Sequence, residues 1–242
     1  MRAKDFRSLA RDTLRGKWGV AVAVCFVAGL LLSGITSIFM AGNTGDMVRA
    51  ILTMDEEAIL NASLKYTSVS WIASLIVFVL SGVVNFGLCD FFTRMVKGEP
   101  VKVKQLFGHF GRIGAGIGMT FMIGLFTYLW SLLFVIPGII AAYRYAMVPY
   151  LMAEFPDLGV MDAIRESKRL MQGNKWRLFC LELSFFGWAL LAALTCGIGQ
   201  LWLNPYMHTA RAAFYMEVTG RGASAEPRQP VQPDYLNRSP EL

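Results

Sequence analysis

Apolar residues gather in six long stretches along this chain, and charged residues lie mostly in the segments between them. Most of the stretches are long enough for an α-helix to cross the bilayer's hydrocarbon core, which takes about 20 residues. They lack the alternation of a membrane β-strand. Because backbone polar groups in lipid must be satisfied within the chain, the pattern predicts spanning helices. We place them at residues 19–40, 69–92, 113–136, 139–153, 176–195 and 200–218.

The predicted fold is all-α: a polytopic helical membrane protein with about six transmembrane helices, arranged as three hairpins, and with cytoplasmic amphipathic helices. Residues 1–219 form one transmembrane domain, which includes interfacial helices at 2–15 and 157–172. Residues 220–242 contain four prolines and few aliphatic residues. Such a composition cannot build a packed core, so we expect a disordered cytoplasmic tail.

The first interfacial helix places Arg7, Arg11 and Arg15 on one face and most of its apolar residues on another. A basic amphipathic helix of this kind lies at the level of the lipid headgroups. A glycine followed closely by Lys-Trp ends it at 16–18, and the same order recurs at 173–176. Either the chain repeats a unit of interfacial helix plus hairpin, or each helix that meets the membrane needs the same anchors.

The connections between the spans carry weaker signals. Residues 41–67 predict a loop, with a short helix at 47–60. Pro-Gly at 137–138 predicts a tight reversal between the third and fourth spans. The fourth span, 139–153, is short and contains Pro149, so it is kinked, tilted into a thinned region, or partly re-entrant.

Charge decides the orientation and the expected partners. The chain has 242 residues, 55% of them hydrophobic and 17% charged, with a net charge of +6. Basic segments precede the first, third and fifth spans, whereas the loop at 41–67 has an acidic balance. The excess of Lys and Arg in cytoplasmic loops therefore predicts cytoplasmic N and C termini. We expect membrane lipids as partners, with anionic headgroups at the basic helices, and no nucleic acid.

Motifs for catalysis or for cofactor binding are missing from the sequence. No phosphate-binding loop, nucleophile elbow or zinc-protease helix is present. The four cysteines form no C-x-x-C pair, and the two histidines are isolated from one another. We therefore expect no enzymatic activity, no metal and no cofactor.

Ionisable residues inside a membrane span are costly, which makes them candidates for function. Four are present: Asp90, Arg144, Glu182 and Arg211. Glu182 and Arg211 lie at similar distances before and after the turn that joins the last two spans, so we predict that they pair. Their pairing either avoids two lone buried charges or contributes to a transport site. Asn204, in an Asn-Pro pair, predicts a break in the sixth span. Such a break either marks a substrate site, as in transporters, or reflects packing, since membrane helices tolerate proline.

Arg144 and Asp90 each have more than one explanation. Arg144 lies close to the outer turn and has no obvious partner in its own hairpin. It extends toward the interface, pairs with Glu182 or Asp90, or lines a polar cavity. Asp90 lies near the cytoplasmic end of the second span and is therefore also explained as an interfacial residue.

Several short motifs in order resemble a known family. They are LWSLLFVIPGII at 129–140, GNKW at 173–176, LSFFGW at 183–188, GIGQLW at 197–202 with Pro205-Tyr206, and AFY at 213–215. Together they are similar to the bacterial integral-membrane family called domain of unknown function 975, over roughly residues 1–218. The resemblance implies a helical protein of the bacterial inner membrane. It implies no activity, substrate or catalytic residue.

Two functions follow as expectations. The first is a non-enzymatic membrane component that acts as a scaffold, binds a partner membrane protein of unknown identity, or maintains the envelope. The alternative is a transporter for a small molecule or lipid, with a polar site around Arg144, Glu182 and Arg211. A connected polar cavity that reaches Arg144 favours transport, whereas a dry packed bundle favours the scaffold.

Overall fold

The computed structural model describes residues 2–195 and 197–221, so the predicted tail at 220–242 lies almost wholly outside the described residues. Within these ranges the chain is helical and contains no strand, which confirms the all-α prediction. A π-helical turn, Leu30–Gly34, joins α2 to α3, and two 3-10 turns, Val103–Phe107 and Phe110–Arg112, precede α5. The α-helices are α1 (Ala3–Leu14), α2 (Trp18–Gly29), α3 (Ile35–Thr53), α4 (Glu56–Val96), α5 (Ile113–Leu133), α6 (Val135–Tyr145), α7 (Val148–Glu154), α8 (Val160–Leu170), α9 (Lys175–Leu194) and α10 (Gln200–Val218).

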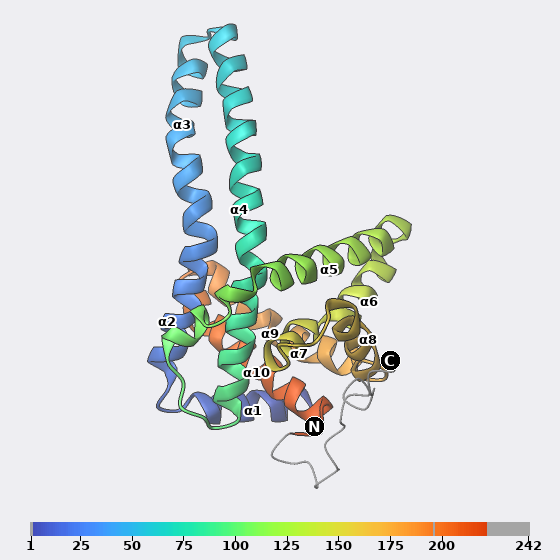
Figure 1. Cartoon of the computed structure of the whole chain (residues 1–242). Coiled ribbons are helices and arrows are strands. Elements are labelled where there is room, and N and C mark those ends of the chain that lie inside the picture. The colour runs from blue at the N-terminus through green and yellow to red at the C-terminus, as the bar shows by residue number, and fades with distance from the viewer. Residues whose placement is uncertain (1, 196, 222–242) are drawn as a thin grey trace.

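The helices form a base with two projections. Helices α1 and α7 to α10 gather around the C-terminal half of α4, whereas the α3–α4 pair projects far beyond them (Figure 1). The α5–α6 pair leaves the base in a different direction, at a steep angle to α4 (Figure 1). The base holds most of the buried side chains, among them Phe86, Phe91, Phe92, Phe214 and Tyr215. Many exposed apolar side chains lie on the two projections.

Five helical segments in the described part of the chain are long and apolar enough to cross a membrane. They are Trp18–Ile38, Glu56–Val96, Val103–Leu132, Val135–Glu154 and Lys175–Leu194. The chain is therefore a membrane protein with several helical spans. Helix α10 is not among the five, since it contains Asn204, His208, Arg211 and Glu217. A sixth span and the arrangement as three hairpins remain predictions.

The loop predicted at 41–67, with a short helix inside it, is wrong. Helices α3 and α4 continue through this segment and meet at a turn of two residues, Met54 and Asp55. The Asp55 carboxylate accepts hydrogen bonds from the backbone N–H groups of Glu57 (3.1 Å) and Ala58 (3.2 Å) and so caps α4. Acidic residues in the first turn of α4 favour the same start, because they complement the helix dipole.

The fourth predicted span is interrupted. The chain reverses at Phe134, whose backbone is extended, and α6 begins at once, so the reversal predicted at 137–138 is displaced. Gly138 instead lies inside α6 and packs on Ser131, where a Cβ atom would meet the serine side chain. Helix α6 ends at Tyr145, and Pro149 lies in the first turn of α7, where its missing N–H costs nothing.

The predicted interfacial helices are both present. Helix α1 covers most of 2–15, and α8 covers the centre of 157–172. Gly16 (φ 75°) and Gly173 (φ 76°) end the two helical segments in the left-handed conformation that glycine adopts without strain. Helix α1 is more than a surface helix, however, because its apolar stripe, including Phe6, is fully buried against α9 and α10.

Candidate functional site

The predicted pair of Glu182 and Arg211 is formed. Glu182 lies in the middle of α9, and its Oε1 is 2.8 Å from Nη2 of Arg211 on α10. The sequence placed the two residues at matching distances from the α9–α10 turn, and the antiparallel packing of the two helices brings them together. The Tyr143 hydroxyl, on α6, donates a hydrogen bond to Oε2 of the same carboxylate at 2.6 Å. Both carboxylate oxygens are therefore occupied.

A cavity of about 280 Å³ adjoins this pair. Helices α4, α6, α7, α9 and α10 all contribute to its walls, and its polar side chains include Asn85, Tyr143, Glu182, His208 and Arg211. Nε of Arg211 is buried and has no hydrogen-bond partner among the residues that the structure describes. The site thus offers a guanidinium donor and a few polar groups in a largely apolar wall, which is the usual character of a small ligand pocket.

The other three predicted residues lie elsewhere. Arg144 does not line this cavity, and its half-buried side chain pairs with no carboxylate in the described ranges. Its backbone carbonyl accepts a hydrogen bond from Ser167 Oγ of α8 (2.9 Å), at the interruption between α6 and α7. Asn204 is exposed, and α10 runs without interruption through Pro205, so the predicted break is wrong. The Thr209 hydroxyl donates to the carbonyl of Pro205 (2.7 Å) inside the continuous helix.

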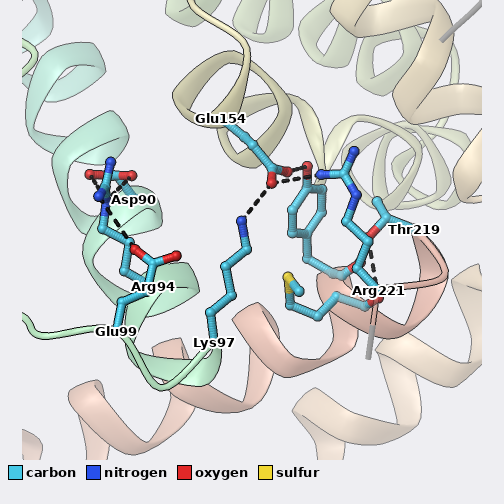
Figure 2. Close-up of polar contacts among 9 residues, drawn as sticks. Asp90, Arg94, Lys97, Glu99, Glu154, Thr219 and Arg221 are labelled. Carbon is cyan, nitrogen blue, oxygen red and sulfur yellow. Dashed lines mark hydrogen bonds and ion pairs between the residues drawn. The ribbon is translucent and has the colours of Figure 1, made fainter. Parts of the chain in front are cut away.

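Asp90 is engaged within its own helix. Its carboxylate accepts from Nε of Arg94, one turn later, at 2.8 Å, and Arg94 also reaches Glu99 at 3.4 Å (Figure 2). This geometry fits the interfacial explanation of Asp90. Asp90 neither contacts the Glu182–Arg211 pair nor lines the cavity beside that pair.

Sequence reasoning missed a carboxylate of the base that contacts three other side chains. Glu154, the last residue of α7, is 2.7 Å from Lys97 Nζ and 2.6 Å from Arg221 Nη1, and it accepts a hydrogen bond from the Tyr215 hydroxyl at 2.6 Å (Figure 2). The contacts join the ends of α4, α7 and α10. The four residues come from three separate parts of the sequence, and no periodic pattern marks them as partners. The one available signal was a carboxylate at the end of an apolar span.

A further ion pair joins α9 to α10, and its arginine also contacts α1. Arg177 Nη2, on α9, is 2.6 Å from Glu217 Oε1 on α10. The Arg177 guanidinium also lies over the rings of Phe6 and Phe214, with its Cζ 6.0 and 5.8 Å from the ring centroids. Cations at this distance from a ring face are attracted to it. Charged groups of the base therefore hold helices together.

The chemistry available at these sites is limited. No group of three His, Cys, Asp or Glu side chains that could hold a metal ion occurs among the described residues. The Glu182 cavity can hold a small polar or anionic group, since Arg211 supplies a donor there. The Glu154 cluster is saturated by its three partners and serves to join helices.

Comparison with known proteins gives a family and no activity. A family model described as "Protein of unknown function (DUF975)" matches residues 1–141 and 132–222, which together cover most of the chain. No curated protein and no solved structure matches the sequence of this chain. The match agrees with the ordered motifs and the helical membrane fold described above. The chain therefore belongs to the DUF975 family of proteins of unknown function.

Proposed function

We propose that this protein is a non-enzymatic membrane scaffold that binds a partner protein through the tip of the α3–α4 projection. The observation that carries the proposal is the length of α4 combined with the exposed apolar side chains at its far end. With 41 residues and a rise of about 1.5 Å per residue, α4 is about 61 Å long, roughly twice the hydrocarbon thickness.

The charged end of α4 supports a position of its other end outside the membrane. Asp90 and Arg94 mark the end near the base, and Leu60 lies 30 residues before Asp90, about 45 Å along the helix. A bilayer with its headgroups measures about 40–45 Å, so the segment beyond Leu60 extends out of it. The acidic residues Asp55, Glu56 and Glu57 at the tip agree with a location in water.

Apolar side chains are nevertheless exposed at this tip. Met54 is 86% exposed, and Ile51, Leu52 and Leu60 are also exposed. Several large apolar side chains gathered at a tip in water mark a protein interaction site, because exposing them to solvent is unfavourable. The packed base supports the same function, since its charges pair with one another and fix the direction of the projection.

Photocrosslinking in native membranes tests this proposal. A photoreactive residue at Leu60 should give a discrete protein adduct. The same residue at Leu75, which is exposed on α4 about 22 Å from Asp90 and within the hydrocarbon, is the matched control and should give lipid adducts. Absence of a protein adduct at Leu60, in a chain that inserts and accumulates normally, would refute the proposal.

We also infer that the protein resides in a bacterial cytoplasmic membrane with both termini in the cytoplasm. The distribution of basic residues around the first, third and fifth spans supports this orientation. A membrane-impermeant thiol reagent applied to intact cells should then label a Glu57→Cys variant and leave a cysteine appended at the C terminus unlabelled. Labelling of both positions from outside would contradict the orientation and indicate that α10 does not cross.

Transport is the second candidate function, and the 280 Å³ cavity beside Glu182 and Arg211 favours it. Arg144 does not line this cavity, so the polar site proposed for transport consists of Tyr143, Glu182 and Arg211. Binding of small anions to the purified protein, compared with binding to an Arg211→Gln variant, tests this alternative. Equal binding by both proteins would refute it.

A further inference from the structure

A second cavity lies apart from the Glu182 site, between α1 and the α9–α10 hairpin. Its volume is about 730 Å³, within the usual range for ligand pockets. Helix α1 forms one wall, and the other walls come from Trp18 at the start of α2, the C-terminal half of α9, the turn after it, and the N-terminal half of α10. This cavity does not depend on the proposed partner-binding tip, which lies on other helices.

Hydrogen bonds fix the wall formed by α1. The Tyr206 hydroxyl of α10 donates to the backbone carbonyl of Arg7 (3.1 Å), and Nη1 of Arg7 donates to the carbonyl of Ser184 on α9 (3.3 Å). The buried Phe6 ring packs against Phe214, with their centroids 5.4 Å apart. The cavity is therefore a built feature of the packing between three helices.

The charged lining of the cavity has one sign. Lys4, Arg7 and Arg11 line it, and among the residues 2–195 and 197–221 no carboxylate does. Lys4 and Arg11 are exposed and pair with no carboxylate in the described part of the chain. The acidic residues of α1 point to other partners: Asp5 accepts from the backbone N–H of Arg2 (2.7 Å), and Asp12 pairs with Arg15 (3.5 Å). An anionic group would thus meet three cations at the mouth.

The rest of the lining is apolar and rich in tryptophan. Trp18, Trp188 and Trp202 contribute to the walls, together with Leu191 and Leu203. Tryptophan concentrates at the boundary between headgroups and hydrocarbon, where its ring contacts both. An apolar cavity with a cationic mouth matches a molecule that has an anionic head and a hydrocarbon chain.

The geometry points to a binding site for one anionic phospholipid, with its phosphate at Lys4, Arg7 and Arg11 and an acyl chain between α1 and the α9–α10 hairpin. Charge complementarity selects the headgroup, and burial of the chain against the tryptophan walls holds the lipid. The bound lipid fills the space between α1 and the α9–α10 hairpin and stabilises their packing.

Quenching of tryptophan fluorescence by brominated lipids tests the site. The protein carries Phe in place of Trp71, Trp130 and Trp176, which are exposed elsewhere, so the emission comes from the three tryptophans of the cavity. It is reconstituted in phosphatidylcholine vesicles that contain a minor fraction of brominated phosphatidylglycerol or of brominated phosphatidylcholine. We expect quenching at a much lower fraction of the anionic lipid.

Two variants and one control decide the outcome. Lys4→Gln with Arg11→Gln should raise the half-quenching fraction of brominated phosphatidylglycerol by roughly 30-fold, since each cation near a headgroup contributes about fivefold. Arg2→Gln with Arg15→Gln removes the same charge from α1 outside the cavity and should leave the fraction unchanged.

Ser8→Phe, which places a ring in the cavity, should reduce quenching by the anionic lipid without any change of charge. Equal quenching by the two lipids in the unsubstituted cavity would overturn the proposal. An equal effect of the two charge variants would do the same, because it would show a general attraction of α1 to the membrane surface.

Discussion

Breaking the ion pair of Glu182 and Arg211 should destabilise the protein by amounts that differ between the two partners. Glu182→Gln and Arg211→Gln remove one charge each; the first is isosteric, and the second also shortens the side chain. In Glu182→Gln the amide oxygen still accepts from Tyr143, while Arg211 loses its counterion and keeps a buried Nε without a partner. In Arg211→Gln that buried Nε disappears and Glu182 keeps its tyrosine, so this variant should be the milder one.

The magnitude follows from the burial of the pair. Removing one partner of a fully buried pair costs about 3–5 kcal/mol, whereas exposed pairs contribute less than about 1 kcal/mol. The side chains of Arg211 and Glu182 are 38% and 26% exposed, which lies between these cases. We therefore expect about 2–3 kcal/mol for Glu182→Gln and about 1–2 kcal/mol for Arg211→Gln.

A double-mutant cycle measures the coupling. The free energy of unfolding is determined by reversible denaturation in mixed detergent micelles for the wild type, both single variants and the double variant. The double variant should be more stable than the sum of the single effects predicts, by about 1–2 kcal/mol. Additive effects, with no coupling beyond about 0.5 kcal/mol, would refute a stabilising role of the pair.

Three further predictions concern a close helix contact, a helix cap and an arginine without a carboxylate partner. Gly82→Ala should destabilise the α4–α5 contact by about 1–3 kcal/mol, because its added Cβ would clash with the backbone carbonyl oxygen of Gly116. In the same unfolding assay Gly124→Ala, with open space around it, should be neutral or stabilising, and equal effects would contradict the close approach. Asp55→Ala should cost about 1 kcal/mol through loss of the cap of α4, whereas Asp55→Asn should cost little, and an equal loss for both would argue against capping. Arg144→Ala should insert and accumulate as the wild type does, since the Arg144 side chain pairs with no described carboxylate, and reduced accumulation on immunoblots would contradict this.

Local features of the fold follow from the sequence because their causes are local. Long apolar runs predicted helices in lipid, and the glycines at 16 and 173 predicted where α1 and the segment of α8 end. The Glu182–Arg211 pair could also be predicted, since two antiparallel helices joined by a short turn place residues at equal distances side by side. The prediction of a loop at 41–67 is wrong because polar residues scattered through the segment obscure its helical pattern. Asp55, which caps the start of α4, is one of these polar residues.

The contacts between distant segments were decided by the tertiary structure. Lys97, Glu154 and Arg221 come from three separate parts of the chain, and no pattern in the sequence sets the angles at which their helices meet. The isolation of Arg144 and the cavity beneath α1 also arise from these angles. Hydropathy acts residue by residue and determined that the chain is helical and lies in a membrane. Which charges meet depends on helix packing, which is a property of many weak contacts made together.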